Sequence, residues 1–212
     1  LLPWADGVVT SPGQSRRLAT RTRKDAALLV SGDWTNALRG GDFVLPPENI
    51  SYIPLLNTAD ALDLGASALV MHFLLGHEES IDAQCLQQVV QLALEGMSNG
   101  MPLIVDVHPI GPRVVLMSKA IELGVSYALE GGADGIAIPW PGGSSFEDIQ
   151  TMAAGVPLWV KPATVDANAP DLAEMLNLGA AGLWLDERVF AAEDPAATVR
   201  AFHDLLHEPV EV

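Results

Sequence analysis

Several features that mark common functional classes are absent or rare in this 212-residue sequence. Its one cysteine, Cys85, lies in a stretch with helical spacing, so we expect a buried, reduced thiol and an intracellular protein. The glycine-rich loops that hold dinucleotides or nucleoside triphosphates are missing, which argues against an open nucleotide-binding sheet. The apolar runs are much shorter than the roughly 20 residues of a membrane-spanning helix, and the first residues show no secretion signal. We therefore expect a cytoplasmic protein with no membrane partner.

Positive charge is also scarce. Lysine occurs only as Lys24, Lys119 and Lys161, and the formal net charge is −16 at pH 7. A surface of this sign repels nucleic acid and anionic membranes, so neither is expected as a partner. Hydrophobic residues make up 49% of the sequence and charged residues 18%, which predicts one domain over residues 1–212 with a large core.

Apolar stretches of strand length alternate with amphipathic stretches of helical spacing along the chain. The strand candidates are nearly continuous apolar runs, as expected of parallel strands that are buried on both faces. They span residues 7–11, 26–32, 67–75, 102–108, 135–140, 157–162 and 182–186. The clearest helices span residues 80–98, 113–130, 170–178 and 194–207. Residues 33–57 are rich in Gly, Pro and Asn and are predicted as a loop.

A short junction of small residues precedes four of these strands. It includes Ala5, Ala66, Ala133 and Ala180, and in three cases it follows a helical ending with a glycine suited to a left-handed C-cap. Each interval between junctions holds one further strand and its helix, so the junction marks every second βα unit. Eight parallel units close into a TIM (β/α)8 barrel. The sequence therefore predicts this α/β barrel, with its first strand outside the given chain.

Candidate functional residues stand at the carboxyl ends of the predicted strands, where barrel enzymes place their sites. Asp106 and His108 are two residues apart on one strand, so their side chains share a face. Lys161 ends another strand, and we predict catalytic roles for these three residues. The expected substrate-binding residues are His72, Asp33, Asp186 and Trp140. Each also has a structural explanation, as an interior histidine, a core aromatic or a turn residue.

The order and spacing of several segments resemble the archaeal-type class I fructose-bisphosphate aldolase family, which includes aminodideoxy-heptulosonate synthases and an autoinducer-phosphate thiolase. Residues 65–80 (GASALVMHFLLGHEES) are similar to the family's fourth strand, and residues 100–111 (GMPLIVDVHPIG) to its fifth. Residues 181–190 (AGLWLDERVF) are similar to its eighth, and the match covers essentially the whole chain. The resemblance implies a carbon–carbon lyase that forms a Schiff base with a ketone, uses no metal or other cofactor, and assembles as a homo-oligomer.

The resemblance also implies departures at the family's functional positions. Ala137 stands at the position of the Schiff-base lysine, His108 at that of a proton-transfer tyrosine, and Ile110 at that of a neighbouring arginine. The seventh strand ends in Lys161-Pro162 where the family has two phosphate-binding glycines, and the eighth ends in Asp186-Glu187-Arg188 instead of Gly-Arg-Asn. Acidic residues at that place would repel a phosphate.

Three functions remain open from the sequence. The first is a lyase in which Lys161 supplies the amine and His108 acts as acid and base on a sugar or keto compound, with or without phosphate. The second is a metal-assisted lyase or hydrolase with Asp106, His108 and Asp186 or Glu187 as ligands. The third is a protein that has lost aldolase chemistry and serves in binding or assembly, which the loss of the lysine, the arginine and the phosphate-binding strand ends favours.

Overall fold

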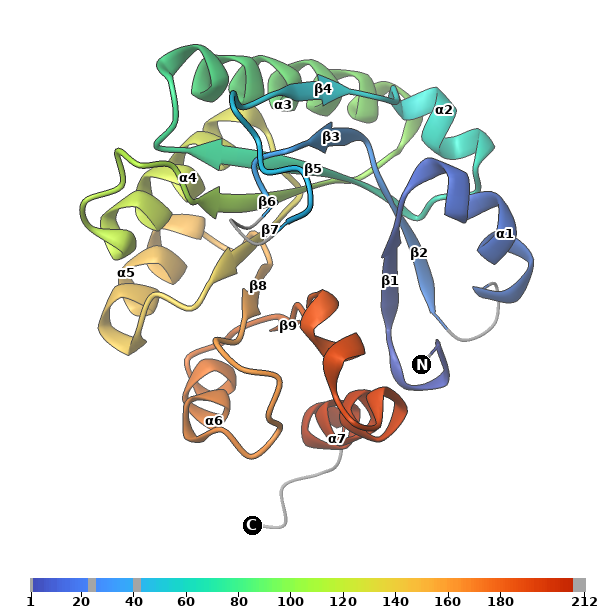
Figure 1. Ribbon diagram of the computed structural model, residues 1–212, viewed down its shortest axis with the longest axis vertical. Coiled ribbons are helices and arrows are strands. Elements are labelled where there is room, and N and C mark those ends of the chain that lie inside the picture. Colours follow the sequence, from blue (N-terminus) through green and yellow to red (C-terminus); the bar gives the residue numbers. More distant parts are fainter. Residues whose placement is uncertain (1, 23–25, 40–42, 208–212) are drawn as a thin grey trace.

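Seven parallel strands form the main sheet of the protein, whose computed structural model describes residues 2–22, 26–39 and 43–207. The strand order is β1-β2-β5-β6-β7-β8-β9, which is also their order along the chain. Figure 1 shows the sheet curled into an arc, with helices around its outer side. In the described part of the chain, β1 and β9 each pair with one neighbour and stand at the two ends of the arc. This arrangement confirms the predicted α/β barrel architecture, with seven of its eight strands.

The elements follow the alternation expected from the sequence. The strands of the main sheet are β1 (Gly7–Thr10), β2 (Ala27–Ser31), β5 (Ala68–Leu75), β6 (Leu103–Pro109), β7 (Gly135–Pro139), β8 (Leu158–Lys161) and β9 (Gly182–Leu183). The α-helices are α1 (Pro12–Thr22), α2 (Thr58–Asp63), α3 (Glu79–Asn99), α4 (Met117–Gly131), α5 (Gly143–Ala153), α6 (Pro170–Asn177) and α7 (Pro195–His207), and the 3-10 helices are η1 (Leu2–Trp4) and η2 (Glu187–Ala191). In the part of the chain that is described, no helix combines the length and apolar character that crossing a membrane requires.

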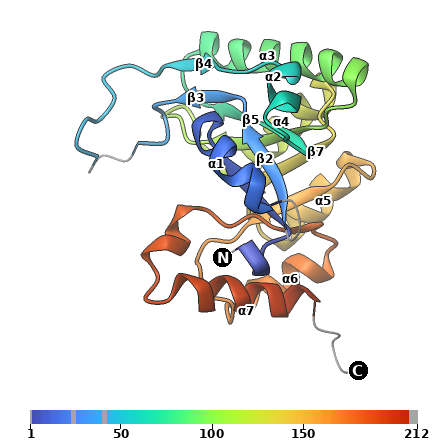
Figure 2. The same ribbon diagram turned by 90° about the vertical axis from the view of Figure 1, so that its right-hand side faces the viewer.

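The predicted loop at residues 33–57 was wrong at its two ends. Residues Asp33–Thr35 form β3 and pair antiparallel with Tyr52–Pro54, which form β4. Figure 2, in which α6 and α7 lie at the bottom, shows this hairpin at the opposite side of the molecule, beside α3. The apolar residues of β4 are too few for a periodic signal, so the pattern of the sequence did not reveal this strand. The hairpin matters because it places Asp33 in a fixed extended segment.

Two further boundaries differ from the prediction. β9 ends at Leu183, because Asp186 turns the chain into η2 and accepts a hydrogen bond from the backbone N–H of Arg188 at 3.0 Å. The helix predicted from residue 113 begins at Met117, because the preceding turn is bonded to the end of β5: the backbone N–H of Arg113 donates to the carbonyl of Gly76 at 2.9 Å.

The recurring small-residue junctions do what the sequence predicted. Gly132 and Gly179 follow α4 and α6 with φ of 91° and 92°, in the left-handed region that favours glycine. The next residues, Ala133 and Ala180, donate their backbone N–H groups back to the last turn of the helix, at 3.0 and 3.1 Å. Each helix therefore ends close to the sheet, and the following strand starts at once.

The strands bury both faces, and the two faces have different partners. The outward side chains of β5 to β8 pack against the helices in one large cluster that includes Phe73, Val105 and Ile138. The inward side chains form a smaller apolar cluster inside the arc, with Val70 and Ile104 buried against other apolar residues. The partly buried rings of Trp159 and Trp184, 6.2 Å apart, pack against this inner cluster. The inner cluster forms the floor on which the polar residues of the strand ends lie.

The packing of the inner apolar cluster predicts that alanine substitutions at two glycines differ in their effect on stability. A Cβ added at Gly135, on β7, would lie 2.5 Å from Cζ3 of Trp159, whereas one added at Gly13 would have nothing within 4 Å. We expect Gly135→Ala to lower the free energy of unfolding by about 1–3 kcal/mol, because the indole of Trp159, which packs against the inner cluster and Trp184, would have to shift. Gly13→Ala is the matched control and should cause no loss. Urea titration of both variants measures the difference, and equal stability would contradict this view of the interior.

Candidate functional site

Polar side chains from four strands gather above the inner apolar cluster. They are contributed by β3, β5, β6 and β8, and they include five residues that the sequence singled out: Asp33, His72, Asp106, His108 and Lys161. The prediction that these strand ends converge is therefore confirmed. The arrangement follows from strand geometry, because alternate residues of a strand share a face and parallel strands present their carboxyl ends at one rim.

Lys161, Asp106 and His108 are in mutual contact. Lys161 Nζ forms an ion pair with Asp106 Oδ1, and Asp106 Oδ2 lies 3.0 Å from His108 Nε2. The distance from Lys161 Nζ to His108 Nε2 is 3.2 Å. The three side chains are 12%, 7% and 16% exposed, respectively. An amine, a carboxylate and an imidazole thus lie together in a largely buried site, in which a proton can pass between neighbouring atoms.

His72 is held by Asp33 through two contacts. The Asp33 carboxylate lies 2.6 Å from His72 Nδ1 and also accepts the backbone N–H of His72 at 2.7 Å. The Asp33 side chain is completely buried. This contact fixes the ring orientation and leaves Nε2 directed away from Asp33. The centroid of the His72 ring lies 5.2 Å from that of His108. Asp33 and His72 therefore form one continuous polar cluster with Asp106, His108 and Lys161.

Burial and charge act against each other on the pKa values of these groups. Burial alone would lower the pKa of His72, but the Asp33 carboxylate outweighs it and raises this pKa above the ordinary 6.5. Burial lowers the pKa of His108, and the neighbouring Asp106 does not fully compensate. For Asp106, burial opposes ionisation, yet His108 and Lys161 hold its pKa well below the ordinary range. The cluster therefore contains an ionised Asp106 beside an imidazole that favours its neutral form.

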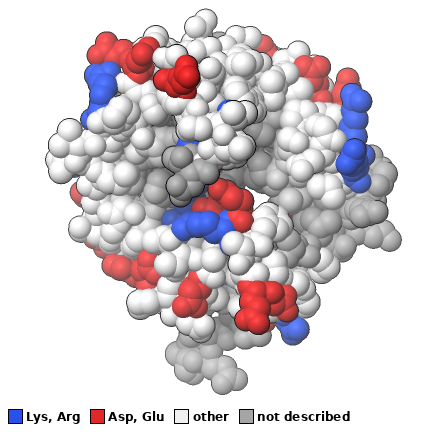
Figure 3. Space-filling view, in the orientation of Figure 1, with Lys and Arg blue, Asp and Glu red and all other residues white. Residues whose placement is uncertain are grey.

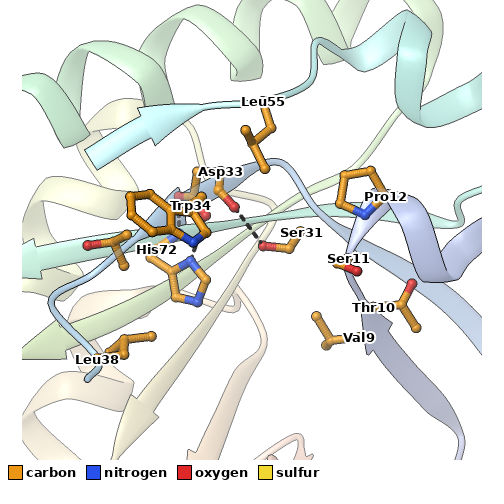
Figure 4. Close-up of a pocket in the computed structure, with 11 residues that line it drawn as sticks. Val9, Thr10, Ser11, Pro12, Ser31, Asp33, Trp34, Leu38, Leu55 and His72 are labelled. Carbon is orange, nitrogen blue, oxygen red and sulfur yellow. Dashed lines mark hydrogen bonds and ion pairs between the residues drawn. The ribbon is translucent and has the colours of Figure 1, made fainter. Parts of the chain in front are cut away.

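A cavity of about 270 Å³ opens next to His72, between β1, β2 and the hairpin. Figure 4 shows His72 and Trp34 on one side of it and Ser11, Thr10 and Val9 on the other. Its lining is apolar with several hydroxyl groups: Val9, Thr10, Ser11, Pro12, Ser31, Asp33, Trp34, Thr35, Leu38, Leu55 and His72. Such a space accommodates a small molecule that reaches the polar cluster past His72.

Sequence reasoning missed Trp34, Thr35 and Leu38 as part of this cavity. They belong to the hairpin and the connection that follows β3, which the sequence indicated only as a loop. The signal available was the position of Asp33-Trp34-Thr35 directly after a predicted strand end, since βα loops supply the ligand contacts of barrels.

The side chains of Asp186 and Trp140 have their main partners outside the polar cluster, although the backbone N–H of Trp140 donates to the carbonyl of Lys161 at 3.2 Å. The Asp186 carboxylate binds the guanidinium of Arg188, with 2.8 Å from Nε to each carboxylate oxygen. The Trp140 ring packs against Phe146 of α5, with 5.4 Å between ring centroids. Figure 3 shows the face of the molecule that contains a central hollow, which both acidic and basic side chains border. Substrate-binding roles for Asp186 and Trp140 stay predictions.

Ala137 lies in the layer of inward residues next to Asp106. The backbone register aligns His72 with Asp106, Asp106 with Ala137, and Ala137 with Trp159. Lys161 is aligned with Pro139, two residues further along β7 than Ala137, and its side chain extends to Asp106. An amine that starts from β8 therefore reaches the carboxylate adjacent to Ala137.

Three residues of the cluster also have the composition of a metal site. One ligand atom each from His72, Asp106 and His108 lies within 4.8 Å of the others. Two imidazoles and a carboxylate suit a transition-metal ion. His72 takes the place that the sequence gave to Asp186 in the metal hypothesis, because the Asp186 carboxylate is bound to Arg188. Lys161 competes with a cation here, since its amine already neutralises Asp106.

Comparison with curated proteins shows similarity to aldolase-type enzymes. The chain is 25% identical to a 2-amino-4,5-dihydroxy-6-oxo-7-(phosphonooxy)heptanoate synthase of Streptomyces griseus, over 95% of the chain and 73% of that protein. It is 24% identical to an uncharacterised aldolase of Saccharolobus solfataricus, over 76% of the chain and 62% of that protein. A 3-hydroxy-5-phosphonooxypentane-2,4-dione thiolase of Yersinia pestis is 28% identical over 70% of the chain, which spans half of that protein's length.

Solved structures agree on the fold. A Schiff-base-forming fructose-1,6-bisphosphate aldolase superposes with a TM-score of 0.78 at 22% identity, over 95% of this chain and 79% of the other. An archaeal fructose-1,6-bisphosphate aldolase gives the same TM-score at 21% identity, over 96% and 79%. No family model matches the chain. The resemblance to the archaeal-type class I fructose-bisphosphate aldolases is confirmed: the chain has their barrel fold, and its sequence is similar to those of related enzymes at 24–28% identity.

The contact between Asp33 and His72 predicts a specific pH effect. Because Asp33 raises the pKa of His72, protonated His72 stabilises the fold fully below its unfolded pKa, and this stabilisation is lost as the pH rises through the folded pKa. Asp33→Asn should lower the pKa of His72, since burial is then opposed only by the more distant charge of Asp106.

The ring protons of His72, followed by NMR during a pH titration, measure this change. Asp63→Asn, at an exposed aspartate of α2, is the control and should leave the His72 pKa in place. An unchanged His72 pKa in Asp33→Asn would contradict the assigned contact.

Proposed function

We propose that the chain is a lyase of the class I aldolase type in which Lys161, from β8, supplies the amine that forms an imine with a small carbonyl substrate. One observation carries the proposal: the amine contacts Asp106, the carboxylate that is aligned with Ala137 on the neighbouring strand. The amine thus lies close to the place where the resemblance expects the Schiff-base lysine, although it comes from another strand.

The surroundings of Lys161 supply the proton transfers that imine formation requires. A lysine amine must lose a proton before it can attack a carbonyl carbon. His108 Nε2, 3.2 Å away, is positioned to accept this proton, and Asp106 then faces the imidazolium that results. Asp106 stays ionised throughout and holds both partners in place. His108 acts as acid and base, and Asp106 stabilises the charge that moves between them.

The reaction follows from these positions. The lone pair of Lys161 Nζ attacks the carbonyl carbon, and the carbonyl oxygen takes up protons and leaves as water, which gives a protonated imine. The bond between the α-carbon and the carbon that bears a hydroxyl then breaks. The hydroxyl loses its proton to His108, a new carbonyl forms, and the electron pair of the broken bond moves onto the α-carbon to give an enamine. Protonation of this carbon and addition of water release the second product and restore the amine.

His72 and Asp33 have a binding role in this proposal. His72 borders both the cavity and the cluster, and its Nε2 is available to a hydroxyl group of the substrate. Asp33 fixes the ring from behind. Since both residues lie on the cavity side of His108, the part of the substrate beyond the carbonyl would occupy the cavity.

Trapping with borohydride tests the role of Lys161. We expect incubation with dihydroxyacetone and borohydride to give a stable secondary amine at Lys161, located by peptide mass spectrometry. Lys161→Met should give no adduct, and Lys119→Met, at an exposed lysine of α4, should react as the unaltered protein does. Asp106→Asn should reduce the yield by about tenfold or more, because the proton transfer loses its stabilising charge. Absence of the adduct from the unaltered protein would refute an imine mechanism.

A metal-assisted lyase or hydrolase is the second candidate, and the closeness of His72, Asp106 and His108 favours it. In that case Zn²⁺ added to the protein should remain bound through gel filtration at one ion per chain. His108→Ala and His72→Ala should each abolish this binding. Lys161→Met should strengthen it, because the amine no longer competes for Asp106. Loss of all Zn²⁺ during gel filtration would exclude this candidate.

A further inference from the structure

The carboxyl ends of β8 and β9 carry the guanidinium of Arg188, and the protein itself occupies every nitrogen of that group. Nε lies 2.8 Å from both oxygens of the Asp186 carboxylate, and Nη2 lies 2.8 Å from Oδ2. Nη1 donates to the carbonyl of Ala163 at 2.5 Å, and Nη2 donates to that of Pro162 at 2.9 Å. These contacts use Nε–H and one N–H of each terminal nitrogen. To bind a phosphate through Nε and Nη2, the half-exposed guanidinium would have to release the Asp186 carboxylate.

The Asp186 carboxylate also accepts a hydrogen bond from a backbone amide after β9. It accepts the backbone N–H of Arg188 at 3.0 Å, in addition to the guanidinium. A backbone amide and an arginine are the groups with which proteins commonly bind phosphate oxygens. Asp186 is thus an internal anion in contact with these donors, and its pKa is lowered because Arg188 outweighs the effect of its partial burial.

In the described part of the chain, the other cation at the ends of these two strands is Lys161. Lys161, like Arg188, is paired with a carboxylate of the protein, in this case the buried Asp106. Both positive side chains are therefore neutralised by neighbouring carboxylates. Among the described residues at the ends of β8 and β9, a phosphate would meet Asp186 and Glu187, while Arg188 and Lys161 are already paired with carboxylates.

The cavity gives independent support. Its lining consists of apolar and hydroxyl side chains with one carboxylate and one imidazole, and among the described residues no lysine or arginine borders it. The hydroxyl of Ser11 suits a hydroxyl of a neutral compound. The hydroxyls of Thr10 and Ser31 bond to Ser15 and to the carbonyl of Asp33, respectively, and their oxygens can still accept from such a compound. The part of a substrate that extends from the carbonyl carbon would therefore be uncharged.

We infer that the substrate is an uncharged hydroxy-carbonyl compound without a phosphate group, and that Asp186 determines this specificity by holding Arg188. The inference rests on the proposed lyase function, whose substrate it defines. It sets this chain apart from the relatives whose names include a phosphonooxy group.

A matched pair of ligands tests the inference. Calorimetric titration of the unaltered protein with dihydroxyacetone should show saturable binding, and dihydroxyacetone phosphate should bind at least about tenfold more weakly. In Asp186→Asn, the affinity for dihydroxyacetone phosphate should rise about tenfold relative to that for dihydroxyacetone. The reason is that a like charge is removed and the guanidinium of Arg188 is released. Glu130→Gln removes the same charge at the end of α4, beside the amino ends of the strands, and should leave the ratio unchanged.

Two results would overturn the inference: binding of the phosphate compound as tight as or tighter than that of dihydroxyacetone, or no binding of either by the unaltered protein. The comparison on the unaltered protein decides the matter if Asp186→Asn does not fold. Borohydride treatment of the same samples separates the two proposals. A preference for dihydroxyacetone without an adduct at Lys161 would remove the imine mechanism and keep the specificity. An adduct at Lys161 together with a preference for the phosphate compound would keep the imine mechanism and remove the proposed specificity.

Discussion

The ion pair between Lys161 and Asp106 is the interaction on which the rest of the site depends. Asp106 lies in the middle of a strand whose other residues, apart from His108, are apolar and buried, and only 5% of Asp106 is exposed. A carboxylate at such a place is costly unless a cation and hydrogen bonds compensate the loss of water. Lys161 and His108 provide this compensation from β8 and from the same strand. The charge of Asp106 in turn keeps an amine and an imidazole together inside the barrel, where an apolar pair would serve stability equally well.

The inward side chains of the barrel form this site in two layers, one apolar and one polar. Apolar inward side chains from β2, β5, β6, β8 and the chain following β9 close the interior below. The polar residues occupy the next layer toward the carboxyl ends, where the strands end and the cavity begins. At the rim, Asp186 and Arg188 bind each other and hold the chain after β9 close to the end of β8. The polar cluster, the cavity that shares Asp33 and His72 with it, and the paired Asp186 and Arg188 thus belong to the same end of the barrel.

Much of the fold was accessible from sequence, because buried parallel strands and glycine-capped helices leave strong local patterns. The residues at strand ends could be named for the same reason. What the sequence could not supply were contacts across the barrel: that Asp33 holds His72 over 39 positions of sequence, or that Arg188 satisfies Asp186. The hairpin escaped because β3 and β4 have three residues each, too few for periodicity to register. Lys161 was identified by its rarity, but its contact with Asp106 depends on the register of β6, β7 and β8.

The most direct test of the central interaction is a double-mutant cycle on Lys161→Met and Asp106→Asn, with the free energy of unfolding measured by urea titration. A buried ion pair predicts that the two single variants together lose more stability than the double variant, with a coupling free energy of at least about 1 kcal/mol. This follows because each single change leaves the other charged group without its partner. Losses that add to within about 0.5 kcal/mol would show that the amine and the carboxylate do not interact in the folded protein, and would contradict the site described above.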